Sequence, residues 1–174
     1  LQIDNSAVNR ASELLLSNHD SDGDGINDLV LFVAPIGGTA GQLEYQVIYG
    51  GPGLFGQIDP DTIVLDGDNG FKIIGPSASG GYTNFYEHLT DFNQDGRDDL
   101  TLNSFTIDGI TADFFVFGPE RGTTSVIDLA QLDGSNGFKI VDPRTPPIYN
   151  TISLNPEDTN GDGISDILLF YNQA

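Results

Sequence analysis

Three copies of one nine-residue pattern, D-x-[DN]-x-D-G-x-x-D, constrain the fold of this chain more than any other feature. The copies occupy residues 20–28, 91–99 and 158–166, here called the first, second and third loops, and an apolar run follows each. Oxygen-bearing side chains in a tight loop are the ligands that a hard divalent cation such as Ca²⁺ requires. The pattern therefore predicts three Ca²⁺ sites, each directly before a β-strand.

Each predicted site combines side-chain oxygens from positions 1, 3, 5 and 9 with the backbone carbonyl of position 7. In that order, the ligands are Asp20, Asp22, Asp24, Asp28 and Ile26 in the first loop, Asp91, Asn93, Asp95, Asp99 and Arg97 in the second, and Asp158, Asn160, Asp162, Asp166 and Ile164 in the third. Position 6 is Gly in every loop, which permits a sharp turn because glycine has no Cβ.

Two other interpretations of the loops are less consistent with the sequence. An EF-hand or dockerin loop needs a bidentate Glu at position 12, whereas position 12 here is Leu31, Leu102 or Leu169. Three Asp/Gly-rich turns without an ion are the second alternative. The same four oxygen positions, followed by the same kind of strand in all three copies, favour ion binding.

Charge repulsion supports the same interpretation. Two carboxylates ~4 Å apart repel by about 1 kcal/mol in water and about 4 kcal/mol at an effective dielectric constant near 20. Because a whole domain is stabilised by only about 5–15 kcal/mol, several carboxylates in each loop would be costly without a cation. We therefore expect the ions to stabilise the fold.

The formal charge of −20 over 174 residues restricts the partners. Three Ca²⁺ ions would leave about −14, which argues against nucleic acid or an anionic membrane as a partner. The chain has no Cys, and no apolar run is long enough to span a membrane. It also lacks Met and begins at Leu1, so we expect a processed or excised segment. Because Ca²⁺ is abundant outside cells, an extracellular or cell-surface location is expected.

A second repeated segment defines the repeat unit. Residues 65–74 (LDGDNGFKII) and 132–141 (LDGSNGFKIV) are identical at eight of ten positions, and their Phe residues lie 20 residues before Asp91 and Asp158. Strands are expected at residues 13–17, 28–34, 42–49, 100–107 and 110–117, with a two-residue hairpin at Asp108-Gly109. The unit thus has four strands, as in propeller blades. Residues 1–12 would form an extra strand or a loose N-terminal arm.

This unit resembles the FG-GAP repeat of integrin α-subunit β-propellers and bacterial surface proteins. The resemblance rests on the three loops, on Phe117-Gly118 and the Gly-Pro that follows, and on the Asn-Gly-Phe-Lys-Ile strands. It implies an all-β chain of about two and a half four-stranded blades with Ca²⁺-binding hairpins, used for adhesion, ligand binding or scaffolding. The single partial propeller would comprise repeats at about residues 13–80 and 81–148 and a half repeat at 149–174.

The unfinished third blade suggests how the chain associates. Residues 166–171 would form an exposed apolar edge strand, which is a template for another strand. The chain could be part of a longer propeller, several copies could close a ring, or copies could join head to tail, with residues 1–10 completing the next blade. The expected partners are therefore other copies or further blades, with a glycan or surface protein as ligand.

No catalytic motif stands out, so we expect a non-catalytic, Ca²⁺-stabilised structural or adhesive module. Neither a His pair with metal-binding spacing, nor a nucleophile elbow, nor a phosphate loop is present. His19 reads as a solvated loop residue, and His88 lies beside the second loop. The alternative function is carbohydrate binding, in which Tyr82, Phe85 and Tyr86 would stack on a sugar. An enzyme would need a carboxylate pair outside the loops.

Overall fold

The structure is a computed structural model that describes residues 2–3, 10–35, 43–52, 57–59, 62–75, 89–107, 110–141 and 158–167. In these residues the secondary structure is β-strand apart from one short 3₁₀ helix, η1 (Leu129–Gln131). The expectation of an all-β chain is therefore confirmed for this part of the sequence. No helix in it is long and apolar enough to cross a membrane.

Residue contacts divide the chain into two units, which are described separately. The first unit comprises Leu1–Ala78 and Pro119–Gln131, and the second comprises Ser79–Gly118 and Leu132–Ala174. The first and second loops thus belong to different units, and the third loop belongs to the second unit.

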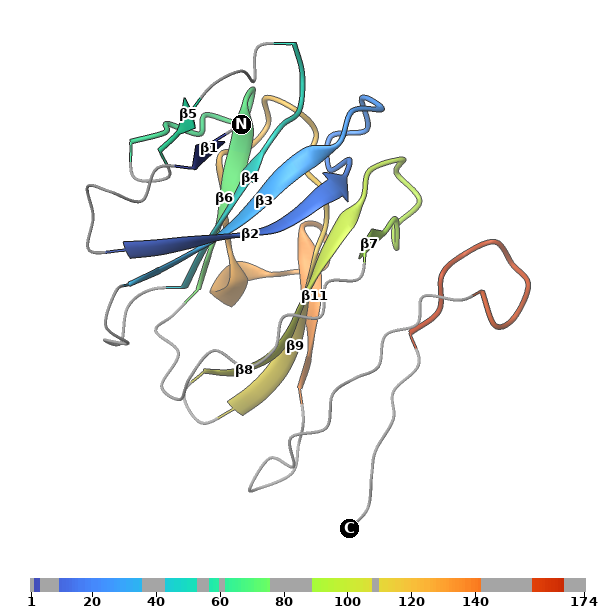
Figure 1. Ribbon diagram of the computed structural model, residues 1–174. Coiled ribbons are helices and arrows are strands. Elements are labelled where there is room, and N and C mark those ends of the chain that lie inside the picture. Colours follow the sequence, from blue (N-terminus) through green and yellow to red (C-terminus); the bar gives the residue numbers. More distant parts are fainter. Residues whose placement is uncertain are drawn as a thin grey trace. The chain divides into compact units, whose positions relative to one another are not determined.

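The first unit contains a five-stranded sheet and a short two-stranded sheet (Figure 1). In spatial order, the larger sheet consists of β10 (Val126–Asp128), β6 (Gly70–Gly75), β4 (Leu43–Ile48), β3 (Asp28–Pro35) and β2 (Arg10–His19). The small sheet pairs β1 (Gln2–Ile3) with β5 (Gln57–Ile58) in parallel. The expected strands at residues 13–17, 28–34 and 42–49 correspond to β2, β3 and β4.

The second unit repeats the same order of strands. Its four-stranded sheet consists of β11 (Gly137–Val141), β9 (Ile110–Val116), β8 (Asp99–Ile107) and β7 (Leu89–Thr90). Ile107 pairs with Ile110, as expected for antiparallel strands joined by two residues. Both sheets therefore contain four equivalent strands in the same spatial order: the strand before the loop, the strand after it, its hairpin partner and the Gly-Phe-Lys-Ile strand.

Apolar side chains cover both faces of β3. Leu29, Leu31 and Val33 form a buried cluster together with Ile48, Ile58 and Leu65. Side chains of a strand alternate between faces, and the intervening Val30 and Phe32 are also buried. The Phe32 ring lies 5.2 Å from that of Tyr45, centroid to centroid. Burial on both faces explains why the sequence after the first loop is a continuous apolar run.

Aromatic rings pack against one another in the second unit. The rings of Phe115 and Phe138 are stacked, with centroids 4.5 Å apart and planes 5° apart. Phe92, at the second position of the second loop, meets Phe115 edge-on at 5.3 Å. Phe115 is fully buried. The second loop is therefore anchored to the sheet by an aromatic contact that the first loop, with Ser21 at that position, does not have.

The Asp-Gly-x-Asn-Gly segments form the same turn in both units. The amide of Gly67 donates to the carbonyl of Gly70, and that of Gly134 to the carbonyl of Gly137, both at 2.9 Å. Gly70 and Gly137 have φ values of 141° and 138°. A Cβ on either would lie 2.1 Å from a carbonyl oxygen of the neighbouring strand. Glycine is thus required where each Gly-Phe-Lys-Ile strand begins, which explains this shared sequence.

Two short parallel pairings link segments that are similarly spaced in the sequence. Lys72 of β6 pairs with Val126 of β10, 54 positions later, and Gln2 of β1 pairs with Gln57 of β5, 55 positions later. The pairing of β1 with β5 therefore resembles the pairing of β6 with β10 in direction and in sequence spacing. Of the segment 1–12, Gln2–Ile3 and the start of β2 are in strands, and residues 4–9 lie outside the described part.

Candidate metal centre

Antiparallel strand pairs hold two of the three loops at their ends. His19 of β2 pairs with Asp28 of β3 around the first loop, and Thr90 of β7 pairs with Asp99 of β8 around the second. Each of these loops therefore joins two strands, and the expectation that a strand follows each of them is confirmed. After the third loop, Asp166 forms an isolated β-bridge. The rest of the expected edge strand, residues 168–171, lies outside the described residues.

The Asp at position 1 organises each loop by accepting backbone hydrogen bonds. In the first loop, Asp20 Oδ1 accepts the amides of Gly23 at 2.8 Å and Asp24 at 3.0 Å, and Asp20 Oδ2 accepts the amide of Gly25 at 2.9 Å. These bonds wrap the loop around one carboxylate. They also bring backbone dipoles toward its negative charge, which stabilises the turn.

The second and third loops repeat this arrangement. Asp91 accepts the amides of positions 5 and 6 at 3.0 and 2.8 Å, and Asp158 accepts the corresponding amides at 3.0 and 2.7 Å. The hydrogen bonds to Asp158 lower the pKa of its carboxyl, and the one from the amide of Gly163 has the largest effect. The φ values of Gly25, Gly96 and Gly163 at position 6 are 83°, 84° and 86°. The expected role of this glycine in the sharp turn is confirmed.

Position 4 also has a left-handed backbone in every loop. The φ values are 75° at Gly23, 58° at Gln94 and 81° at Gly161. Among the described residues, Gln94 is the one non-glycine with a positive φ. Its Nε2 donates to the carbonyl of Gly163 at 3.2 Å, so it contacts the third loop. The repeated conformation holds even where the residue disfavours it.

Positions 3 and 5 each give one oxygen to the loop backbone. Oδ1 of Asp22, Asn93 and Asn160 accepts the amide of position 5 at 3.2, 3.0 and 2.9 Å. Oδ1 of Asp24, Asp95 and Asp162 accepts the amide of position 7 at 2.8, 3.0 and 2.8 Å. Ile26, Arg97 and Ile164 are the residues whose carbonyls are predicted to bind the ion. Their amides are held by the carboxylate two positions earlier. A second oxygen of each position-5 Asp remains for another partner.

The Asp at position 9 is buried in the first and second loops and fastens each loop to the following strands. Asp28 Oδ2 accepts the amide and hydroxyl of Ser21 at 2.8 and 2.5 Å, and Oδ1 accepts the amide of Gly50 at 2.7 Å. Burial raises the pKa of Asp28 to about 6, against the opposing effect of these hydrogen bonds.

Asp99 is held in the same way. Its carboxylate accepts the amides of Phe92 at 2.8 Å and Gly118 at 3.0 Å, and burial raises its pKa to about 6. In the third loop, Asp166 Oδ2 accepts the amide and hydroxyl of Thr159 at 2.9 and 2.5 Å. A cation would favour the charged form of these carboxylates, opposing the effect of burial.

Three carboxylates converge in the first loop. One oxygen from each of Asp20, Asp22 and Asp28 lies within 4.8 Å of the others. In the part of the chain that the structure describes, three acidic side chains come this close in the first loop alone. Asp24 stands outside this group. The second and third loops have Asn at position 3, so one acidic ligand fewer can converge there. The donor set of the first loop fits a hard divalent cation.

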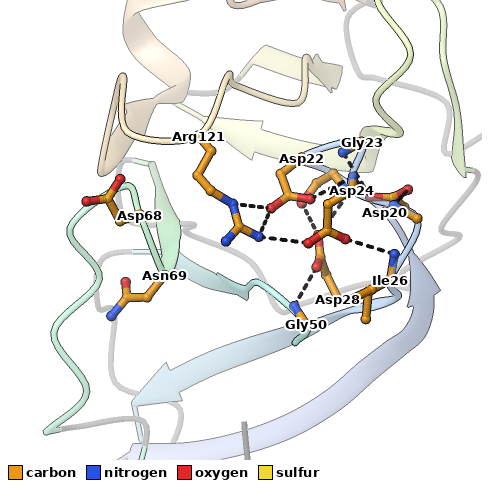
Figure 2. Close-up of polar contacts among 12 residues, drawn as sticks. Asp20, Asp22, Gly23, Asp24, Ile26, Asp28, Gly50, Asp68, Asn69 and Arg121 are labelled. Carbon is orange, nitrogen blue, oxygen red and sulfur yellow. Dashed lines mark hydrogen bonds and ion pairs between the residues drawn. The ribbon is translucent and has the colours of Figure 1, made fainter. Parts of the chain in front are cut away.

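Arginine side chains lie against two of the loops, a feature that the sequence pattern did not predict. Figure 2 shows Arg121, from the segment that follows β9, pointing at Asp22 and Asp24. Its guanidinium carbon also lies 4.9 Å above the centre of the Tyr49 ring. The hydrogen bond to Asp22 is the main reason that the pKa of Arg121 is raised. Arg97, at position 7 of the second loop, donates to Asp95.

A pocket of about 430 Å³ opens beside the first loop, on the side where Arg121 lies. Asp24, Tyr49, Asp68, Asn69 and Arg121 are among its lining residues. Asn69 Nδ2 donates to the carbonyl of Val64 at 2.8 Å, and Asn69 Oδ1 accepts the amide of Asp66 at 3.1 Å. The side-chain amide of Asn69 therefore holds the neighbouring turn.

One expectation beside the site was wrong. His19 is not a solvated loop residue, because it ends β2 and is fully buried. Burial lowers its pKa to about 4, despite the nearby charge of Asp20. β2 extends to the residue directly before Asp20, the first predicted ligand, so it includes His19. The other candidates, Tyr82, Phe85, Tyr86 and His88, lie outside the described residues.

Comparison of the chain with models of protein families, with curated proteins and with solved structures gives no match. The resemblance to FG-GAP repeats rests on the sequence pattern and stays a prediction.

Proposed function

We propose that this chain is a non-catalytic structural or adhesive module whose three loops bind Ca²⁺. The observation that carries the proposal is the threefold recurrence of one hydrogen-bond pattern around the predicted ligands. In each loop, position 1 accepts the amides of positions 5 and 6, position 3 accepts that of position 5, and position 5 accepts that of position 7. Such a network fixes the side chains that would hold the ion relative to the loop backbone.

The chemistry of these ligands supports Ca²⁺ over other ions. All side-chain donors are carboxylate or amide oxygens, with no His or Cys among them, which disfavours zinc and copper. Mg²⁺ demands a near-ideal octahedral geometry and keeps several of its waters, whereas Ca²⁺ accepts six to eight oxygens in a flexible arrangement. When bound, the ion would neutralise carboxylates that otherwise repel one another within each loop.

Thermal unfolding with and without Ca²⁺ tests this proposal. Each loop saturated at a hundredfold excess over its dissociation constant would add about 2.7 kcal/mol, or roughly 5–10 °C in melting temperature for a chain of this size. Melting should be measured by circular dichroism in chelator, in Ca²⁺ and in Mg²⁺. Asp20→Asn should reduce the shift, and Asp68→Asn, an exposed control outside the loops, should leave it unchanged. Equal melting temperatures in Ca²⁺ and chelator would contradict the proposal.

We further propose that the two larger sheets are blade-type repeats. Both have the same order of equivalent strands and the same Asp-Gly-x-Asn-Gly turn, which supports this reading. A repeat unit buries its faces against neighbours of its own kind. Further blades, supplied by other copies of the chain or by a longer propeller, would fulfil this role.

The edge of β11 is the surface we propose for such a neighbour. The equivalent strand β6 pairs with β10 on its outer edge, where the amide of Lys72 donates to the carbonyl of Ser125 at 2.9 Å. Among the described residues, β11 pairs with β9 alone. β11 is also more exposed than β6, with Val141 40% exposed. The parallel pairing of β6 with β10 thus indicates a parallel strand from a further repeat as the occupant.

Light scattering of single-residue variants tests the proposed edge. Lys139 occupies in β11 the position of Lys72 in β6, so its amide would donate to the incoming strand. Lys139→Pro removes this backbone donor, and proline is tolerated in an edge strand. Lys139→Ala keeps the donor. We expect association in Ca²⁺ to be lost in the proline variant and kept in the alanine variant. A wild-type chain that is monomeric at all concentrations, or equal masses for the two variants, would contradict the edge proposal.

We also propose an extracellular or cell-surface location, because Ca²⁺ is abundant outside cells. The carbohydrate-binding alternative stays a prediction, since its aromatic residues lie outside the described part of the chain. Loss of glycan binding in Tyr82→Ala or Tyr86→Ala would favour it.

A further inference from the structure

The second carboxylate oxygen of the position-5 Asp distinguishes the three loops. Oδ1 of Asp24, Asp95 and Asp162 is bonded to the amide of position 7 in each case, so Oδ2 is the oxygen that remains for an ion or another cation. The three Asp residues thus offer a comparison in which the hydrogen bond to Oδ1 is the same and the partner of Oδ2 differs.

In the first loop, Arg121 takes this oxygen. Its Nη2 donates to Asp24 Oδ2 at 3.1 Å, and its Nε donates to Asp22 Oδ2 at 2.6 Å. Nη2 makes a further short contact with the same Asp22 oxygen. The Asp22 side chain is fully buried, whereas that of Arg121 is 43% exposed. The oxygens that the loop backbone leaves to Asp22 and Asp24 are therefore both occupied by one guanidinium.

In the second loop, a different arginine reaches the equivalent oxygen, Oδ2 of the position-5 Asp. Arg97 Nη2 donates to Asp95 Oδ2 at 2.5 Å, and Asn93 Nδ2 donates to it at 2.9 Å. Arg97 Nε donates to the carbonyl of Gly118 at 2.7 Å, which holds the guanidinium over the loop. Two arginines at unrelated positions thus place a guanidinium on the equivalent Asp oxygen of their loops. Arg97 lies inside its loop, and Arg121 lies 97 residues beyond Asp24.

The third loop has no such partner in the part of the chain that the structure describes. Asp162 Oδ1 accepts the amide of Ile164, and no donor among the described residues reaches its Oδ2. The third loop is exposed at every position from Asp158 to Ile164. It therefore provides an internal reference for the effect of the two arginines.

We propose that Arg121 and Arg97 are intramolecular counter-cations that compete with Ca²⁺ for the first and second loops and weaken its binding there. This inference rests on the proposed Ca²⁺ function and specifies how two of its sites are regulated. A guanidinium stabilises the ion-free loop by neutralising its carboxylates, and it opposes a divalent cation by occupying the same oxygens and by like-charge repulsion. Removing the arginine therefore tightens Ca²⁺ binding at its own loop.

Competition also couples ion binding to a neighbouring segment. Arg121 connects the segment Pro119–Gln131 to the first loop and to the face of Tyr49. Ca²⁺ in the first loop would release this guanidinium from Asp22 and Asp24. The ion would thereby exchange a contact between two distant parts of the chain for contacts within the loop.

A Ca²⁺ titration followed by NMR can separate the three loops in one sample. The amides of Gly25, Gly96 and Gly163 occupy the same position in each loop and would report binding individually. We compare the wild type with Arg121→Gln, Arg97→Gln and Lys139→Gln. Lys139 is exposed and lies outside the loops, so its variant controls for the change in net charge. The Nε–H signals of the arginines report directly on release.

Arg121→Gln should tighten binding at the first loop about three- to tenfold relative to Lys139→Gln. The other two loops should stay within about twofold of that control, which is near the effect of an exposed charge. Arg97→Gln should act in the same way on the second loop alone. Arg121→Lys, which keeps the charge but loses the planar fork, should give a smaller gain. In the wild type, the Arg121 Nε–H signal should shift as the first loop fills.

Two failures are distinguishable. If Ca²⁺ moves none of the three glycine signals, the proposed function itself is wrong. If the loops bind Ca²⁺ but neither arginine variant tightens its own loop beyond the Lys139→Gln control, the competition is wrong and the Ca²⁺ function stands. Weaker binding in the arginine variants would also overturn the competition, because it would mean that the guanidinium organises the site.

Discussion

The carboxylate of Asp28 and the amide of Gly50, 22 residues apart, are joined by a hydrogen bond of 2.7 Å. Asp99 and Gly118 form the same bond at 3.0 Å. In each unit, the last predicted ligand of the loop thus reaches the chain just beyond the partner strand. An Asp at position 9 therefore links the candidate ion site to the sheet, and changes at this position should affect both.

Replacing Asp28 with Ala should destabilise the protein even without Ca²⁺. The change leaves the amides of Ser21 and Gly50 and the Ser21 hydroxyl without their acceptor in a buried place, at about 1–3 kcal/mol for each unsatisfied group. We expect a loss of roughly 3–5 kcal/mol in urea unfolding in chelator. Asp68→Ala, at an exposed carboxylate without such bonds, is the matched control. A loss as small as that of the control would contradict the anchoring role.

A methyl group at the start of a Gly-Phe-Lys-Ile strand should be costly for steric reasons. The Cβ of Gly137→Ala would lie 2.1 Å from the carbonyl oxygen of Phe115, whereas that of Gly134→Ala would meet nothing within 4 Å. Both glycines have positive φ, so the backbone penalty of about 1–2 kcal/mol is shared. We expect Gly137→Ala to lose at least about 2 kcal/mol more than Gly134→Ala in urea unfolding. Equal losses would show that the close approach is absent.

The stability of the ion-free protein should depend on the pH through Asp28 and Asp99. Burial raises both pKa values to about 6 from 3.8. Since the folded pKa lies above the unfolded one, each group's contribution is fully present below about pH 4 and is lost as the pH rises through 6.

Unfolding in chelator between pH 4 and 7 measures this dependence. The wild type should lose stability relative to Asp28→Asn and to Asp99→Asn as the pH rises, because the amide stays neutral. A difference between wild type and variants that is independent of pH would contradict the raised pKa values.

Ca²⁺ binding should show the opposite dependence on pH. An ion needs the carboxylates ionised, so protons compete for Asp28 and Asp99 below about pH 6. As the pH falls through that range, the Ca²⁺ affinity of the first and second loops should drop by up to about tenfold per pH unit if binding displaces one proton. Calorimetric titrations at pH 7.5 and 5.0 measure this change. Equal affinities at the two values would mean that the position-9 carboxylates do not bind the ion.

Much of the local fold was predictable because the repeats carry their own chemistry. Val, Ile, Leu and Phe after each loop predicted β3 and β8, and Asp108-Gly109 predicted the connection that pairs Ile107 with Ile110. The loop conformation was predictable too, because glycine at position 6 and Asp at position 1 satisfy one another through the same backbone bonds in all three copies.

Interactions between distant residues were not predictable in this way. Arg121 has no pattern that connects it to Asp22, 99 residues earlier, and the parallel pairing of β10 with β6 involves only three residues. His19 was misassigned because a polar residue beside an Asp-rich loop resembles the loop itself. Burial of that residue depends on how far β2 extends, which single-sequence periodicity does not determine. The Ser or Thr at position 2 of the first and third loops was a signal that could have indicated a hydrogen bond to the Asp at position 9.

The most direct test of the central claim is a count of bound Ca²⁺ ions per chain, by equilibrium dialysis at pH 7.5 followed by elemental analysis. We expect three ions for the wild type and two for a variant in which Asp158→Asn and Asp162→Asn remove two carboxylates of the third loop. A wild-type chain that retains no Ca²⁺ at millimolar free ion, while remaining folded, would contradict it.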